Sequence, residues 1–70
     1  MKLVRMVIGS NLLRLRKQAG YTQETLADAA ELEMKTVQRI ESQQVNPKLA
    51  TLSRLRECLD IEWNELLQGL

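Results

Sequence analysis

The chain of 70 residues carries a formal net charge of +1, and 44% of its residues are hydrophobic but only 3% are aromatic. This length supports one domain over residues 1–70, because a second core would leave neither half enough apolar surface to offset the entropy of ordering its backbone. The near-neutral charge excludes a polycation that coats nucleic acid indiscriminately, and the absence of Phe favours packed helices over a β-sandwich. We therefore predict a single all-α domain.

The first predicted helix covers residues 10–19. Apolar residues in and before this range are spaced four, three and four apart, which places them on one face of a helix. They are Ile8, Leu12, Leu15 and Ala19. Gly20 ends the helix, because glycine adopts the left-handed conformation of a helix C-terminus at little cost. Residues 1–8 precede the helix as an N-terminal arm.

Two shorter helices are predicted next, over residues 23–30 and 34–42. Thr22 is a good N-cap for the first, because its hydroxyl can accept a hydrogen bond from a free N–H in the first turn. Neither Gly nor Pro marks the break at residues 31–33. The residues expected to face inward are Leu26, Ala27, Ala30, Val37 and Ile40. The two helices form one helix-turn-helix unit over residues 22–42.

The clearest break in the chain is Asn46-Pro47. Asn is a good N-cap, and Pro at the first helical position loses only an N–H that would be unpaired anyway. The helix that follows carries leucines at spacings of three, three and four, namely Leu49, Leu52, Leu55 and Leu59. Residues 60–62 break this pattern, and residues 63–67 form a short last helix. The sequence thus predicts five helices.

The chain contains no His and a single cysteine, Cys58. It therefore has too few ligands for a zinc site, and it cannot form an intramolecular disulfide. Acid–base and triad chemistry depend mostly on His, and neither a glycine-rich phosphate loop nor paired acids are present. We expect no enzymatic activity, no metal and no cofactor. The lone cysteine fits a reducing, cytoplasmic setting, and the apolar run in residues 1–8 is too short for a signal peptide or a membrane span.

The third predicted helix leaves four polar residues opposite its buried side, namely Lys35, Gln38, Arg39 and Ser42. Arg and Lys can bond guanine O6 and N7, Gln can bond adenine N6 and N7, and a hydroxyl can bond a phosphate. This face therefore has the groups needed to read base edges. The same residue types are usual on any solvated helix face, so the helix by itself leaves both interpretations open.

The motif residues of the chain resemble the Cro and cI phage-repressor family of helix-turn-helix domains, also called the XRE family. The resemblance lies in Gly20–Ala27, Val37–Glu41, Asn46-Pro47 and Thr51-Leu52, and it covers about residues 8–67. The family's Gln at the start of the motif, its Ala at position five and its aliphatics at positions fifteen and eighteen match Gln23, Ala27, Val37 and Ile40. The resemblance implies a compact five-helix, lambda-repressor-like fold. It also implies a sequence-specific transcriptional regulator, such as a phage or plasmid repressor or a restriction–modification controller.

The resemblance also implies which side chains contact double-stranded DNA. Base contacts fall on Met34, Lys35, Gln38 and Arg39, although Met34 fits a place in the core equally well. Gln23 would bond a phosphate and help to orient side chains of the helix over residues 34–42. The other phosphate contacts are Ser42, Gln43, Gln44, Lys48 and the free N–H groups of the helix after Asn46-Pro47.

Basic residues near the N-terminus divide into candidate contacts and scaffold. Arg14 and Lys17 are either phosphate ligands or solvated surface charges. Lys2 and Arg5 on the arm would reach the DNA backbone. Arg16 is different, because together with Glu41 it matches a family pair that forms a partly buried salt bridge, so we expect both residues to be structural.

Two acidic residues depart from the family pattern. Glu31 stands where the family favours Gly for the turn, and a side chain there would be strained in the left-handed region. Glu33 stands where a small N-cap is usual. It either accepts a hydrogen bond from cytosine N4 and contributes to specificity, or is simply an acid favoured at a helix N-terminus.

One recognition helix reads only a few base pairs, so a protein of this size usually dimerises on a palindrome with half-sites about 34 Å apart. The resemblance places the homodimer contact on the last helix, at Trp63, Leu66 and Leu67, although Trp63 would serve equally well as a cap on the core. The alternative function is a protein-interaction module, such as an antitoxin that masks a toxin, with secondary DNA binding.

Overall fold

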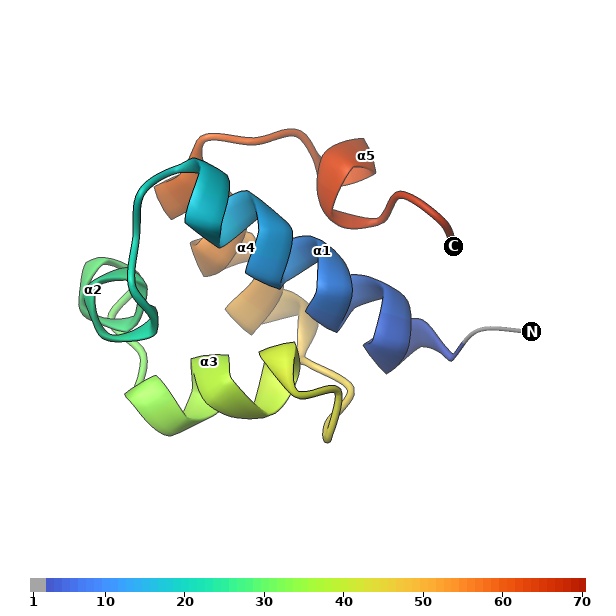
Figure 1. Cartoon of the computed structure of the whole chain (residues 1–70), viewed down its shortest axis with the longest axis horizontal. Coiled ribbons are helices and arrows are strands. Elements are labelled where there is room, and N and C mark those ends of the chain that lie inside the picture. Colours follow the sequence, from blue (N-terminus) through green and yellow to red (C-terminus); the bar gives the residue numbers. More distant parts are fainter. Residues whose placement is uncertain (1–2) are drawn as a thin grey trace.

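A computed structural model describes residues 3–70, which form five helices and no strand. The helices are α1 (Val4–Gln18), α2 (Gln23–Ala29), α3 (Met34–Glu41), α4 (Leu49–Leu59) and α5 (Trp63–Leu66). In Figure 1, α1 crosses the middle of the molecule, with α3 along its lower side, α5 on its upper side and α4 behind. The predicted all-α architecture of five helices is confirmed.

One apolar core lies between the helices and contains most of the residues that the helical spacing predicted. Its buried members are Ile8, Leu12, Leu15, Leu26, Ala27, Ala30, Val37, Ile40, Leu52, Leu55, Leu59 and Leu66. Every helix contributes at least one of them. Because the core takes one stripe from each helix, the opposite stripe of each helix is left to solvent or to a partner.

Two residues of the predicted apolar stripes are exposed instead. Leu49 is 72% exposed, because α4 begins at Leu49 with Lys48 as its N-cap, and its first residue therefore extends beyond the core. The predicted helix start at Asn46-Pro47 was wrong. Ala19 is exposed because it is the C-cap of α1 and lies past the last turn that packs on the core.

The predicted N-terminal arm is wrong for the residues that the structure describes. Helix α1 begins at Val4, with Leu3 as its N-cap, and Val7 and Ile8 are buried. The apolar run that was predicted to be an arm therefore belongs to α1. It lengthens the buried stripe of this helix by almost two turns. The contact expected from Lys2 lies outside the described residues. Within residues 3–70, no helix is both long enough and apolar enough to span a bilayer.

The turn between α2 and α3 contains the strained residue that the sequence predicted. Glu31 has a φ of 56°, in the left-handed region where a Gly would be free of strain. Its N–H donates to the Asp28 carbonyl, its own carbonyl accepts from Arg54 Nη1, and Leu32 N–H donates to the Ala27 carbonyl over 2.8 Å. These bonds close the short turn and fix the angle at which α3 leaves α2.

The crossing of α1 and α3 depends on Gly9. A Cβ at this position would clash with the Ile40 carbonyl oxygen and would lie 3.0 Å from Gln43 Cγ. Glycine is therefore required here by the close approach of the two helices, even though Gly disfavours a helix interior. The position is buried, so the clash cannot be relieved into solvent.

We expect Gly9→Ala to destabilise the fold by about 1–3 kcal/mol through overpacking, despite the higher helix propensity of Ala. The measurement is urea unfolding followed by circular dichroism. Gln18→Ala, at an exposed position of the same helix, is the control and should change the free energy of unfolding by less than about 0.5 kcal/mol. A Gly9→Ala variant as stable as the wild type would contradict the close crossing of α1 and α3.

Candidate nucleic-acid interface

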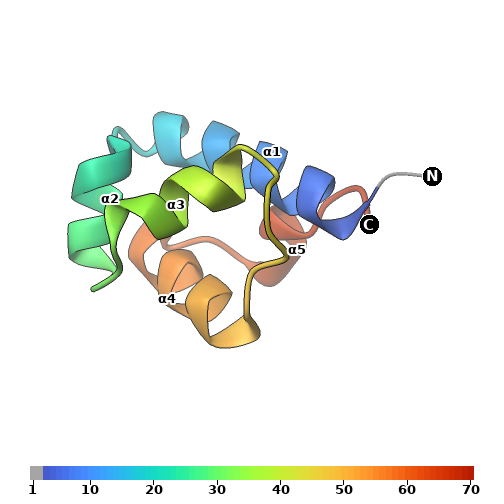
Figure 2. The same ribbon diagram turned by 90° about the horizontal axis from the view of Figure 1, so that it is seen from below.

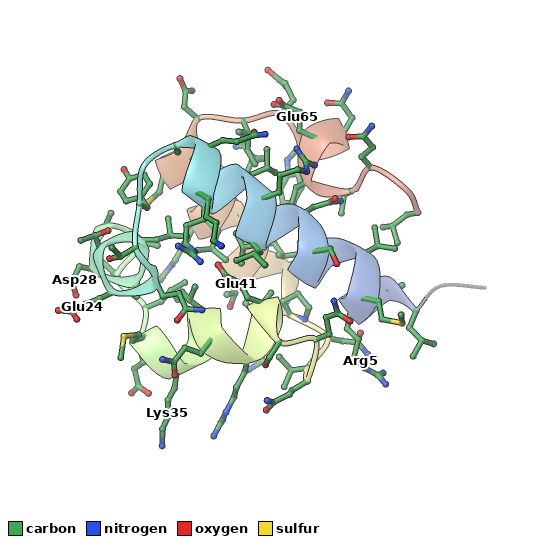
Figure 3. The ribbon with its side chains drawn as sticks, viewed as in Figure 1. Arg5, Glu24, Asp28, Lys35, Glu41 and Glu65 are labelled. Carbon is green, nitrogen blue, oxygen red and sulfur yellow. The ribbon has the colours of Figure 1, made fainter. Side chains whose placement is uncertain are left out.

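Helix α3 buries one face and exposes the other. Val37 and Ile40 are 0% and 1% exposed, and they anchor the inner face in the core. The four predicted base-contacting residues, Met34, Lys35, Gln38 and Arg39, are all exposed. Figure 2 shows α3 lying across the front of the molecule in the view from below, and Figure 3 shows Lys35 pointing away from the body. The helix thus presents an exposed, mostly polar face that no other element within residues 3–70 covers.

Met34 belongs to this outer face. Its side chain is 42% exposed in the first turn of α3, so the interpretation of Met34 as a core residue is wrong. Glu33 is the N-cap of the same helix, is exposed, and makes no side-chain capping bond. Its carboxylate therefore remains available at the end of the polar face.

The ion pair between Arg16 and Glu41, which the resemblance implied, ties α1 to α3. Arg16 Nε donates to Glu41 Oε2 over 2.6 Å, and Arg16 Nη2 donates to Glu41 Oε1 over 2.9 Å. The two side chains are only 9% and 4% exposed. Arg16 Nη1 also donates to the Tyr21 carbonyl over 2.9 Å. The guanidinium therefore fixes α1, α3 and the loop that leads into α2.

The hydrogen bonds that Arg16 donates to Glu41 raise the pKa of Arg16 above its ordinary value, in spite of the burial that lowers it. Because the folded-state pKa is raised, this stabilisation is complete below the pKa of the unfolded chain and is lost only as the pH rises through the folded-state value. The guanidinium is consequently charged throughout the neutral range, and the negative charge that it faces is always compensated there.

Gln23 is the first residue of α2 and lies beside this ion pair. Its Nε2 donates to Glu41 Oε1 over 3.0 Å, and the side chain is half-buried. Helix α2 begins here because Thr22 caps it: the Thr22 hydroxyl accepts from the Thr25 N–H, and the Thr25 hydroxyl bonds back to the Thr22 N–H. The sequence pattern did not reveal the bond between Gln23 and Glu41, because the two residues are 18 positions apart.

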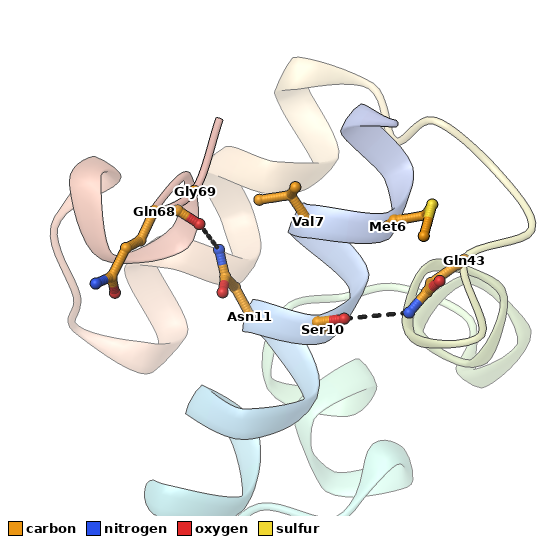
Figure 4. Close-up of a pocket in the computed structure, with 7 residues that line it drawn as sticks. All are labelled: Met6, Val7, Ser10, Asn11, Gln43, Gln68 and Gly69. Atoms are coloured by element: carbon orange, nitrogen blue, oxygen red, sulfur yellow. Dashed lines mark hydrogen bonds between the residues drawn. The ribbon is translucent and has the colours of Figure 1, made fainter. Parts of the chain in front are cut away.

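The loop after α3 contains four of the predicted phosphate contacts. Gln44 and Lys48 are exposed, and each carries a side-chain donor in this loop. The Ser42 hydroxyl donates to the Arg39 carbonyl over 3.3 Å, so it must rotate to donate to a phosphate. Gln43 has a φ of 65°, and its Nε2 donates to Ser10 Oγ over 3.1 Å (Figure 4). Gln43 therefore tethers the loop to α1, and at most one of its amide hydrogens is left for DNA.

Helix α4 supplies free backbone donors next to this loop. Its first intrahelical hydrogen bond runs from the Leu52 N–H to the Lys48 carbonyl, so the N–H groups of residues 49–51 precede it. Such groups, at the positive end of the helix dipole, suit a phosphate. Lys48, the N-cap of α4, is exposed and adds a positive charge at the same end of the helix.

Arg14 does not lie with the other candidate contacts. Its Nη2 donates to Asn11 Oδ1, and Asn11 Nδ2 donates to the carbonyls of Leu66 and Gln68. This side of α1 faces the C-terminal segment, and Figure 1 shows α5 and α3 on opposite sides of α1. Arg14 is nevertheless exposed, so its role as a phosphate contact stays a prediction. Lys17 is exposed in the last turn of α1, and its role stays a prediction.

Figure 3 places Arg5 on the lower side of the molecule, the side to which Lys35 points, whereas Glu24 and Asp28 lie on the outer side of α2. The helical extension of α1 holds Arg5 in this place. The basic residues along the lower side are thus separated from the acidic groups of α2.

Asn11 was missed by the sequence analysis, because its two acceptors lie 55 and 57 positions away. It ties the C-terminal segment to α1 and forms part of a pocket of about 210 Å³. Figure 4 shows that the pocket lies over α1, between Gln43 and Gln68. Of its lining residues, Gln43 belongs to the loop after α3 and none belongs to α3 itself. Among the described residues, no group of His, Cys, Asp and Glu is arranged to hold a metal ion.

The residues predicted for the dimer contact differ in their exposure. Leu66 is 0% exposed and belongs to the core, so a dimer contact at Leu66 is wrong. Trp63 and Leu67 are half-buried and pack on the core from outside. The Arg56 guanidinium lies 5.3 Å from the centre of the Trp63 ring, at cation–π distance. The outer sides of Trp63 and Leu67 remain available to a partner.

Proteins with a similar sequence or a similar structure are known. The sequence model of the family described as Helix-turn-helix matches residues 12–66. The restriction-modification controller protein C.AhdI from Aeromonas hydrophila has a similar structure, with a TM-score of 0.84 and 37% identity over 89% of this chain and 94% of that one. The hypothetical transcription factor NHTF from Neisseria superposes with a TM-score of 0.87 and 26% identity, over 93% of this chain and 75% of that one. No curated protein matches the chain.

We expect Arg16→Met to destabilise the fold by about 3–5 kcal/mol, because it leaves the buried charge of Glu41 without a partner. The double variant Arg16→Met/Glu41→Met should be close to the wild type in stability, since an apolar pair replaces two buried charges. Thermal unfolding of the three proteins is the measurement. Equal destabilisation of the single and double variants would show that the pair acts through packing rather than through charge.

Proposed function

Because the chain belongs to the XRE-type helix-turn-helix family of DNA-binding transcriptional regulators, we propose that it is a sequence-specific regulator that places α3 in the major groove of its operator. The observation that carries this proposal is the exposed face of α3, where Lys35, Gln38 and Arg39 lie opposite the buried Val37 and Ile40. The 37% identity with a controller protein over nearly the whole chain favours a regulator of the restriction–modification controller type.

The side chains of this face suit direct readout of bases. Arg39 and Lys35 can donate to guanine O6 and N7, and Gln38 can bond adenine N6 and N7. Met34 offers an apolar contact for a thymine methyl group, and Glu33 offers an acceptor for cytosine N4. The negative charge of Glu33 would repel a phosphate. At the end of α3, Glu33 therefore favours binding sites on DNA where its carboxylate meets a base edge instead.

Backbone contacts would fix this helix in register without reading sequence. The candidates for these contacts are Gln23, Ser42, Gln44, Lys48, Arg5 and the N-terminus of α4. Lys17 is a further candidate for a phosphate contact, on the ground of its exposure alone. This set of cations and free N–H groups provides an affinity that does not depend on sequence, and it makes binding sensitive to salt through counterion release.

We further propose that the regulator binds palindromic operators as a homodimer. The longest axis of the chain is 33 Å, and successive major grooves on one side of DNA are about 34 Å apart. Two copies in contact are therefore large enough to span two successive turns with their α3 helices. The half-buried Trp63 and Leu67 supply the apolar contact that such a pair needs.

We expect Arg39→Ala to weaken binding to the selected operator by about 1–3 kcal/mol and to relax its sequence preference, because Arg39 reads a base. Lys48→Ala should weaken all duplexes alike, because it contacts phosphate. Gel shifts across a range of salt concentrations, on the operator and on random duplex, measure both effects. Equal losses on all sequences for Arg39→Ala would contradict its assignment as a base reader. A wild-type protein whose binding does not fall with salt would favour the protein-interaction alternative.

The dimer proposal predicts a strict half-site spacing. Inserting about 5 base pairs between the half-sites of the selected operator turns them to opposite sides of the DNA, because one turn takes about 10–10.5 base pairs. We expect affinity to fall at least tenfold, and an insertion of about 10 base pairs to be tolerated better. Gel shift on the three duplexes is the measurement. Affinity that is indifferent to spacing would indicate that each copy binds alone.

A further inference from the structure

The hydrogen bond between Gln23 and Glu41 links the proposed DNA surface to the buried ion pair. Gln23 Nε2 donates to Glu41 Oε1 over 3.0 Å, and the same oxygen accepts from Arg16 Nη2 over 2.9 Å. Gln23 is half-buried, whereas Arg16 and Glu41 are both buried. The amide of Gln23 thus lies between the core and the surface proposed to meet a phosphate.

This bond fixes the orientation of the amide, with its NH₂ group toward Glu41. A carboxylate offers only acceptors, so the NH₂ group of Gln23 must face it, and the amide oxygen would be repelled there. The NH₂ group carries two hydrogens, and Glu41 takes one of them. The second hydrogen is directed away from the carboxylate. It is a donor that is already oriented before any phosphate arrives.

The position of Glu41 would be unfavourable without Arg16. A phosphate oxygen bonded to the second hydrogen of Gln23 Nε2 would lie about 5 Å from Glu41 Oε1, because the two N–H bonds diverge by about 120°, and two negative charges at that distance repel each other. Arg16 donates to both carboxylate oxygens and cancels this charge. The neutral pair can therefore orient the amide without driving the phosphate away.

We propose that Glu41 is a positioning residue of the DNA interface: it holds the amide of Gln23 with a donor directed at a phosphate, while Arg16 neutralises its charge. This inference rests on the proposed function. Neither Glu41 nor Arg16 touches DNA, and both act through Gln23. The ion pair thus connects the fold of α1, α2 and α3 to affinity for DNA.

The test is a double-mutant cycle on DNA affinity. Gln23→Ala is made in the wild type and in the variant Arg16→Met/Glu41→Met, where the acceptor for the amide is absent. Binding to the selected operator is measured at low temperature, with folding checked by circular dichroism. We expect Gln23→Ala to weaken binding about tenfold or more in the wild type, because a hydrogen bond to a charged group is lost. In the double variant the amide is no longer oriented, so the weakening should fall below about threefold.

Lys48→Ala is the matched control, because Lys48 is not among the recorded hydrogen-bond or salt-bridge partners of Arg16 and Glu41. It should weaken binding by the same factor in both backgrounds. If Gln23→Ala also cost the same factor in both, Glu41 would have no positioning role, and this inference alone would be overturned. If the wild-type protein bound no duplex, the proposed function would fail and this inference with it.

A second measurement uses only the wild-type protein, so it does not depend on the folding of a variant. The side-chain amide protons of Gln23 and of the exposed Gln44 are followed by nuclear magnetic resonance in the wild-type protein. We expect one Gln23 proton to exchange with water more slowly than those of Gln44, and the other to shift when operator DNA is added. Exchange as fast as that of Gln44 for both Gln23 protons would overturn the positioning role.

Discussion

The buried pairing of Arg16 with Glu41 is the contact on which the arrangement of α1, α2 and α3 depends. The guanidinium bonds both oxygens of the carboxylate and also the Tyr21 carbonyl, and the carboxylate accepts from Gln23. One pair of opposite charges therefore joins the end of α1, the loop before α2, the start of α2 and the end of α3. Burying two charges is costly, and apolar replacements are often as stable, so the pair determines geometry more than net stability.

The surroundings of this pair show why α3 can be held so firmly with one face free. Gly9 lets α1 approach the backbone of α3 at Ile40, and Ala27 and Ala30 give α2 a flat buried side. Glu31 accepts a left-handed conformation so that the turn between α2 and α3 can be short. The inner face of α3 needs only Val37 and Ile40 to anchor it. The exposed face is consequently free to carry side chains chosen for recognition.

Much of the fold and of the candidate site was predictable because each depends on spacing within one helix. The stripes of α2, α3 and α4 gave the core residues, and the outer face of α3 followed from the inner one. The failures fall at the ends of elements. Leu49 matches the leucine stripe of α4, but the helix start at Lys48 puts it outside the core. Residues 4–8 lacked a stop signal and proved to be helix. Periodicity does not say how far the neighbouring element extends, and that extent decides where a stripe ceases to be buried.

The sequence by itself determined that the chain is all-α, that residues 22–42 form the helix-turn-helix unit, and that α3 has one exposed face rich in polar residues. These properties follow from local spacing and from a family pattern. Only the tertiary structure decided which polar residues share one surface. It placed Arg14 against Asn11 and away from α3, buried Leu66, exposed Met34, and joined Gln23 to Glu41. Each of these outcomes depends on contacts between residues far apart in the chain or on the crossing of helices, and no pattern within a single helix contains that information.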